Sequence, residues 1–170
     1  NFTNLNILVN NAGIQRQIDL TKGIADLESG EDEIRVNLEA PILLSALFIP
    51  HLIKQKKSAI INISSGLAFV PIAAMPVYCA TKAAIHSFSL SLRHQLTRTG
   101  VKIYEVVPPT VDTELDKGTR GRRGQVNRGI KPEEVAAATM MGIENDDFEI
   151  VVGMAQHLMT LSRTNPEQIF

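Results

Sequence analysis

Tyr78 and Lys82 are the two residues of this sequence whose types and spacing most directly suggest acid–base chemistry. They lie four residues apart in the run PVYCATKAA, so on a helix both side chains would occupy one face. A free tyrosine has a pKa near 10 and is a poor acid or base at neutral pH. A cation held nearby favours the phenolate and lowers that pKa, which suits a general acid or base. Taken alone, such a pair is more often ordinary helix surface, so the rest of the chain has to decide.

The elements that would position this pair alternate between short apolar strands and longer helices. Strands are expected at residues 5–10, 58–64, 101–107 and 148–153, and helices at residues 31–56, 77–99, 132–144 and about 155–163. Glu31, Asp32 and Glu33 suit the N-terminal end of the first long helix, and Gly100 is expected to cap the second. This alternation predicts an α/β fold with a parallel sheet covered on both faces.

Small and polar residues follow three of the expected strands. They are Asn10, Asn11, Ala12 and Gly13 after the first strand, Ser64 and Ser65 after the second, and Pro108, Pro109 and Thr110 after the third. The carboxyl ends of parallel strands meet at one edge of the sheet, and Tyr78 begins the helix that follows the second strand. A hydroxyl at Ser65 could hold a substrate oxygen beside the phenol. Such a set suits proton transfer at an oxygen, coupled to hydride transfer at its carbon.

Five motifs in order resemble the short-chain dehydrogenases/reductases, namely LVNNAG, RVNLEAPILLS, INISSG, PVYCATKAA and VVPPTVDT. The resemblance runs from residue 5 to about 115 and more loosely to about 153, and PPTVDTEL resembles a bacterial subgroup associated with D-alanyl-teichoic acid formation. The resemblance implies the C-terminal part of a Rossmann-like, doubly wound parallel sheet. It also implies an NAD(P)-dependent oxidoreductase that interconverts an alcohol and a carbonyl in a small-molecule substrate.

The resemblance implies a role for each matching position. Tyr78 would be the general acid or base, and Lys82 would lower its pKa and bind the ribose of NAD or NADP. Ser65 would hold the reacting oxygen, and Asn37 would anchor a water of a proton relay. Further cofactor contacts are expected from Asn10, Ala12, Gly13, Pro108, Val111 and Thr113.

Pro41 predicts a local irregularity in the first long helix. Proline has no N–H, so Pro41 cannot bond the carbonyl of Asn37 four residues earlier. A carbonyl without its usual partner in mid-helix invites a water or a kink. We therefore expect residues 33–45 to depart from a straight, regular helix.

Two features depart from the family pattern. Pro109 stands where the family usually has glycine, which removes one backbone N–H. In addition, we expect the glycine-rich phosphate loop and the first three strands of the family to be missing, because the sequence starts at what would be the fourth strand. We expect a fragment whose strand 5–10 is a bare apolar edge and which binds cofactor poorly by itself. NAD cannot be told from NADP, because the missing part makes that choice.

A contrasting reading is a non-catalytic remnant or a dimerisation module. In the family, the helices expected here at residues 31–56 and 77–99 pair with a second subunit, so a homo-oligomer is expected under either reading. Composition favours a single domain over residues 1–170, with 44% hydrophobic residues and a formal net charge of -1. This balance argues against nucleic acid or a membrane as partner. The single cysteine, Cys79, excludes an internal disulfide, which suits the cytoplasm, and is expected to pack in the core.

Residues 117–131 form a basic, glycine-containing segment with six of the seventeen Lys and Arg residues and no acid. By the family resemblance this is a flexible loop over the substrate site, an interpretation preferred here to a plain solvated loop or a nucleic-acid segment. The four histidines, at positions 51, 86, 94 and 157, show no ligand-like grouping, so no metal site is expected.

Overall fold

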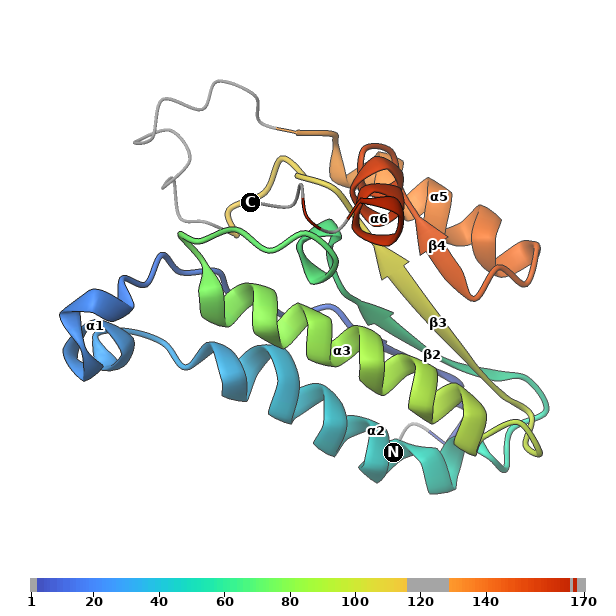
Figure 1. Ribbon diagram of the computed structural model, residues 1–170. Helices are drawn as coiled ribbons and strands as arrows, with labels where there is room; N and C mark the ends of the chain where they lie inside the picture. The colour runs from blue at the N-terminus through green and yellow to red at the C-terminus, as the bar shows by residue number, and fades with distance from the viewer. Residues whose placement is uncertain (1–2, 116–128, 166, 168–170) are drawn as a thin grey trace.

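A four-stranded parallel sheet forms the centre of the structure, which is a computed structural model describing residues 3–115, 129–165 and 167 (Figure 1). The strands are β1 (Ile7–Asn10), β2 (Ser58–Ile63), β3 (Val101–Val107) and β4 (Glu149–Val151), in the spatial order β1-β2-β3-β4. All three pairings are parallel. The predicted α/β fold with a parallel sheet is therefore confirmed.

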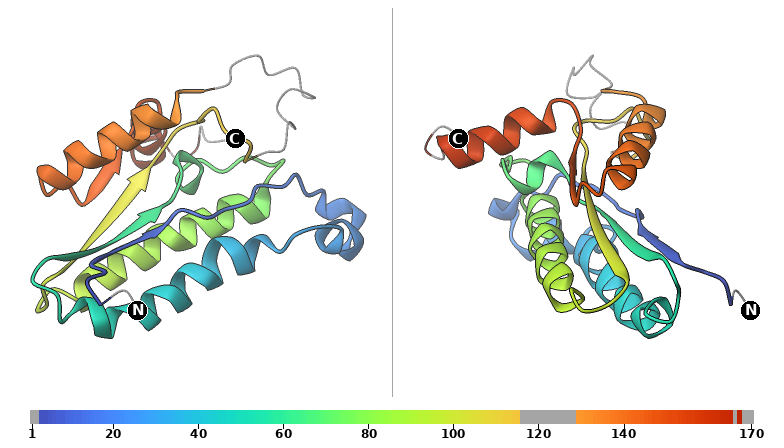
Figure 2. Two further views of the ribbon diagram at one scale, coloured as in Figure 1. Left: turned by 180° about the vertical axis from the view of Figure 1, so that it is seen from behind. Right: turned by 90° about the vertical axis from the view of Figure 1, so that its right-hand side faces the viewer.

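Helices lie on both faces of this sheet (Figure 2). On one face, α2 (Ala40–Leu52) and α3 (Pro76–Gln95) pack against a core that includes Ile60 and Ile103. On the other, α5 (Pro132–Glu144) packs on Ile61 and Val106, while α6 (Ala155–Thr164) lies at the carboxyl end of the strands. Adjacent strand residues point to opposite faces, so the central strands are buried on both sides.

The β1 strand lies at the edge of the sheet and is covered on one face only. Leu8 packs on the core under α2, whereas Ile7 and Val9, on the opposite face, are 49% and 51% exposed. Both side chains are therefore about half exposed, and β1 forms one edge of the sheet (Figure 2). The expected apolar edge at this strand is confirmed.

The first long helix is shorter and less regular than predicted. A π-helical segment, η2 (Arg35–Glu39), precedes α2, and the N–H of Ala40 donates to the carbonyl of Arg35, five residues earlier. The irregularity expected from Pro41 is thus confirmed. The range 31–56 was too long at both ends. Asp32 caps the start by accepting the N–H of Arg35 at 3.0 Å, and α2 ends at Leu52.

The second long helix ends before Gly100, so Gly100 as its cap was wrong. The C-cap of α3 is Leu96. Beyond it, the hydroxyls of Thr97 and Thr99 donate to the carbonyls of His94 and Leu96, at 2.7 and 2.8 Å. Such local bonds compete with helix continuation.

Three short elements were not predicted: η1 (Leu20–Lys22), α1 (Ile24–Glu28) and η3 (Gly66–Ala68). Residues 116–128, most of the predicted basic loop, lie outside the described residues. Among the described helices, none combines the length and the apolar character that crossing a membrane requires.

Candidate active site

The carboxyl ends of β1, β2 and β3 open onto one cavity of about 970 Å³. This volume falls in the upper range of ordinary small-molecule sites. The predicted site residues that line it are Ala12, Gly13, Ser65, Tyr78, Lys82, Pro108, Val111 and Thr113. Side chains from four separate segments of the sequence are therefore brought to one surface.

Tyr78 and Lys82 enter this cavity from the first two turns of α3, which begins with Pro76 in its first turn. Both are buried, and the Lys82 Nζ lies 5.6 Å from the centre of the Tyr78 ring. The same Nζ donates to the carbonyl of Ile63, the last residue of β2, at 2.8 Å. Burial lowers the pKa of Lys82 to about 8. The phenol and a titratable cation thus share one wall of the cavity.

Ser64 and Ser65 both line the cavity, but their hydroxyls are used differently. The Ser64 hydroxyl donates to the carbonyl of Val106 at 3.3 Å. The Ser65 oxygen accepts the N–H of Leu67 at 3.1 Å and caps η3. That bond leaves the Ser65 proton uncommitted. Ser65 is therefore the better placed of the two to donate to a substrate oxygen.

Asn37 does not line the cavity but holds one of its walls in place. Its amide accepts the N–H of Ile14 at 2.9 Å and donates to the Ile14 carbonyl at 2.8 Å. It also donates to the Thr81 hydroxyl at 3.3 Å, which ties the loop after β1 to α3. With the side chain so committed, the water-anchoring role remains a prediction for the main-chain carbonyl of Asn37.

Asn10 also lies away from the cavity, in the layer between the sheet and the helices. Its amide donates to Asn62 at 2.8 Å and to Ser45 at 3.3 Å, and Asn62 in turn donates to Ser89 at 2.9 Å. The alternation of side chains along β1 places Asn10 on the same face as Leu8. Its neighbour Asn11 lines the cavity instead. A cofactor contact through the side chain of Asn10 is therefore not supported.

The part of the cavity wall that follows β3 is held by a short pairing with residues at the end of the basic segment. Val111 forms an isolated parallel bridge with Ile130, whose N–H donates to the carbonyl of Thr110 at 3.1 Å. Gly129, at a φ of 93°, makes this close approach possible, since an added Cβ would lie 2.2 Å from the Thr110 oxygen.

Part of the cavity wall was not anticipated from the sequence. This part consists mainly of apolar side chains from α5, from the N-cap of α6 and from α6 itself. They include Val135, Thr139, Met140, Met154 and Leu158. No motif marks these residues. Only the packing of α5 and α6 around the strand ends makes them part of the site.

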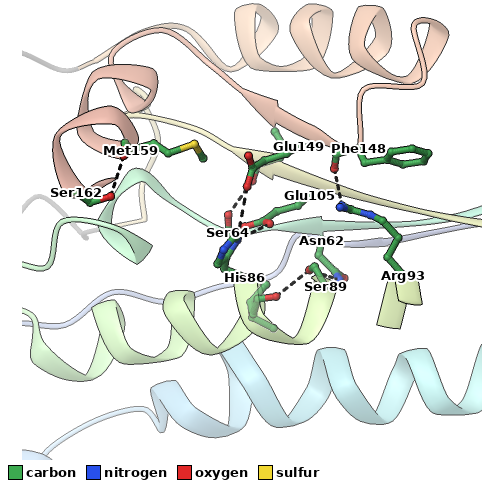
Figure 3. Close-up of polar contacts among 12 residues, drawn as sticks. Asn62, Ser64, His86, Ser89, Arg93, Glu105, Phe148, Glu149, Met159 and Ser162 are labelled. Carbon is green, nitrogen blue, oxygen red and sulfur yellow. Dashed lines mark hydrogen bonds and ion pairs between the residues drawn. The ribbon is translucent and has the colours of Figure 1, made fainter. Parts of the chain in front are cut away.

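A cluster of ionisable groups lies between α3 and the strands β3 and β4 (Figure 3). His86, Glu105 and Glu149 bring their ligand atoms within 4.8 Å of one another. The sequence contains no hint of this grouping, because the three residues come from three elements. The His86 Nδ1 is 2.8 Å from the Glu105 carboxylate, a hydrogen-bonded ion pair when the imidazole is protonated. The absence of a metal site stays a prediction.

Comparison with known proteins identifies relatives across most of the chain. Residues 1–124 match the model of the short chain dehydrogenase family. An uncharacterized oxidoreductase of Bacillus subtilis, DltE, is 48% identical over 169 residues, covering 99% of this chain and 67% of the relative. An uncharacterized oxidoreductase of Staphylococcus epidermidis is 37% identical over 118 residues, covering 69% of this chain and 50% of the relative. The chain thus spans only part of each.

Among solved structures, a short chain dehydrogenase from Burkholderia cenocepacia in complex with NADP matches with a TM-score of 0.80 at 26% identity. The match covers 97% of this chain and 67% of that structure. It supports the predicted Rossmann-like arrangement of the sheet. The family match over more than half of the residues and the shared fold show that the chain belongs to the short-chain dehydrogenase/reductase family.

Proposed function

We propose that this chain supplies the catalytic side of an NAD(P)-dependent oxidoreductase that interconverts an alcohol and a carbonyl. The observation that carries this proposal is the meeting of the Tyr78 phenol, the Lys82 amine and the Ser65 hydroxyl at one cavity. A small-molecule substrate and a cytoplasmic location belong to the same proposal, by analogy with the family.

The residues present fit the nicotinamide end of the cofactor. At Gly13 the backbone approaches the catalytic pair so closely that an added Cβ would lie 3.7 Å from the Lys82 Nζ. A ribose could approach the amine over this bare backbone, and Val111 and Thr113 line the same cavity. The described residues contain no glycine-rich turn leading from a strand into a helix, so they do not account for the pyrophosphate.

The chemistry divides simply among the groups of the cavity. The bound nicotinamide would supply or accept the hydride. The Ser65 hydroxyl would donate to the carbonyl oxygen of the substrate and hold it beside Tyr78. Tyr78 would give its proton to that oxygen in reduction and take it back in oxidation. Lys82 would hold positive charge beside the phenol, and the apolar wall from α5 and α6 would limit access of water.

Cofactor binding by two proteins tests the proposal. One is the 170-residue chain, and the other is a fusion that adds the part of the Bacillus subtilis relative that this chain does not match. Calorimetry with NADH and NADPH should show binding by the fusion at least about tenfold tighter than by the chain alone, because binding energy comes from both halves of the crevice. The fusion should also reduce simple ketones or aldehydes.

The outcomes separate the parts of this proposal. A fusion that folds but binds neither cofactor would contradict the proposed function. Micromolar affinity in the 170-residue chain alone would instead contradict the expectation that its cofactor site is incomplete.

The alternative of a dimerisation module is favoured by one observation, the apolar outer face of α2. Leu43 and Leu47, one turn apart, are 59% and 71% exposed, which is unusual for neighbouring leucines on a free surface. We propose that this face pairs with a second copy. Light scattering should show a dimer that Leu47→Glu converts to monomer. A monomeric wild type would exclude this pairing, without bearing on catalysis.

A further inference from the structure

Besides Lys82, three polar side chains of α3 form hydrogen bonds with the sheet or with the residue preceding β4 (Figure 3). His86 bonds Glu105 on β3, Ser89 accepts from Asn62 on β2, and Arg93 donates to the carbonyls of Ile103 and Phe148, at 3.2 and 2.9 Å. The three residues follow an i, i+3, i+7 spacing and so share one helix face. Apolar packing is not directional, so these bonds set the position of α3 along the strands.

His86 is the contact closest to the catalytic pair, one turn beyond Lys82 and two turns beyond Tyr78. Its partner Glu105 is 0% exposed. One Glu105 oxygen accepts from His86, whereas no hydrogen-bond donor among the described residues reaches the other, Oε1. A buried carboxylate with a single donor depends strongly on that donor. The bond therefore holds the middle of α3 firmly against β3.

We propose that His86 is a positioning residue for the active site. Through Glu105 it holds the turn of α3 that keeps the Lys82 Nζ at the Ile63 carbonyl, and this hold is strongest while the imidazole is protonated. The inference rests on the proposed roles of Tyr78 and Lys82, but its test needs no catalysis.

The groups around His86 explain why its charge matters. Glu105 on β3 lies at 2.8 Å, Glu149 on β4 at 3.9 Å, and Arg163 on α6 is 3.5 Å from Glu149. The Phe69 ring packs edge-on against the imidazole at 4.7 Å. The bond to Glu105 raises the pKa of His86, opposed by burial and by Arg163 and assisted by Glu149. Because folding raises the pKa of His86, the stabilisation of the fold by the His86–Glu105 bond is complete below about pH 6.5. It is lost as pH rises through the pKa of His86 in the folded protein.

The test measures the pKa of Lys82 by NMR of the isotope-labelled 170-residue chain. In His86→Gln, water should gain access to the amine, and the pKa of Lys82 should rise from about 8 by at least about half a unit. Arg93→Gln breaks another contact between α3 and the sheet, two turns farther from Lys82. It should lower the melting temperature without moving the Lys82 signal. His94→Gln, at an exposed position of the same helix, should change neither.

Each result separates positioning from general loosening. Equal shifts in His86→Gln and Arg93→Gln, or no shift in either, would overturn the proposal. In Glu105→Gln, which keeps the shape but removes the charge, the His86 pKa should fall toward its ordinary value. Displacement of the His86 resonances by micromolar Zn²⁺ would also overturn it, because the cluster would then be a metal site. An inactive fusion with a shifted Lys82 pKa would reject the proposed function alone.

Discussion

The chain contains two tyrosines, and each has a lysine nearby, but the surroundings of the two phenols differ. Tyr78 lines the cavity, with the buried Lys82 Nζ 5.6 Å from its ring. Tyr104 lies on β3 on the opposite side of the sheet from α3, and its hydroxyl donates to Asp146 at 2.8 Å. Lys102 pairs with the same carboxylate at 3.3 Å.

The carboxylate of Asp146, which binds the Tyr104 hydroxyl, accounts for the difference between the two regions. Burial and the bond to Asp146 raise the pKa of Tyr104 to about 12, so its proton is held. The Lys102 amine is paired with the Asp146 carboxylate, whereas the Lys82 amine donates to the backbone carbonyl of Ile63. A tyrosine near a lysine is therefore not in itself an acid–base site. Whether the phenol can exchange its proton depends on whether a carboxylate such as Asp146 binds it and on whether a cavity lies in front of it.

Removing the two phenol hydroxyls in turn should give the largest contrast. In the fusion protein, Tyr78→Phe should lower kcat by about 10²- to 10⁴-fold, because the general acid or base is lost. Tyr104→Phe should leave kcat within about twofold, since that hydroxyl faces Asp146 and not the cavity. Steady-state kinetics of both variants measures the contrast. Comparable losses of kcat in the two would remove the distinction between the regions.

Replacing the two lysines should give a smaller contrast, in stability. Lys82→Met removes a buried amine whose pKa falls to about 8, and should stabilise the fold by roughly 2 kcal/mol at pH 7, while activity is lost. The unfolded chain holds this proton up to about pH 10.5. In the wild type, the loss of stability caused by burying the Lys82 amine is therefore complete below about pH 8 and disappears between about pH 8 and 10.5.

Urea denaturation at pH 7 and pH 10 checks this sign. The gain from Lys82→Met should be large at pH 7 and small at pH 10. Lys102→Met serves as the matched control, because Lys102 is half exposed in its ion pair and such pairs contribute little. A Lys82→Met variant that is less stable than the wild type at pH 7 would show that burial of the Lys82 amine does not destabilise the fold.

The smallest effect expected is on Tyr104 itself. In the Tyr78→Phe chain only Tyr104 remains, so ultraviolet absorbance of the phenolate should report a single titration near pH 12. Asp146→Asn should lower that pKa toward 10. Because folding raises this pKa, its stabilisation is present below about pH 10 and is lost as pH approaches 12. Titration near 10 before the Asp146 change would contradict this account.

The parts of the fold that were predicted correctly are those with local boundaries. Strand β3 and helix α5 match residues 101–107 and 132–144 at both ends. Gly100 and Pro108 bound the strand, and Pro132 opens the helix by chemistry that acts on the adjacent backbone. Pro41 likewise predicted the irregular helical turn, because its missing N–H leaves the carbonyl four residues earlier without its usual partner.

Other features depend on residues far away in the sequence. Glu33 lies at the N-terminal end of its helix, as expected, and it is 2% exposed and accepts the N–H of Arg16 at 2.9 Å. Burial raises the pKa of this carboxyl. The side chain of Asn10, a predicted cofactor contact, joins the network of Asn62, and the cofactor contact itself stays a prediction. In both cases a partner distant in the sequence determined the direction of the side chain.

The sequence by itself predicted that Tyr78 and Lys82 share a site with Ser65 and Gly13, because helical periodicity places the pair on one helix face and the strand ends meet at one edge of the sheet. Only the tertiary structure showed that the Ser64 hydroxyl donates to the Val106 carbonyl, that Tyr104 donates its proton to Asp146, and that His86 meets Glu105 and Glu149. Periodicity acts over a few residues. Contacts between elements depend on strand register and on how helices are layered over the sheet, and these are set by packing of the whole fold.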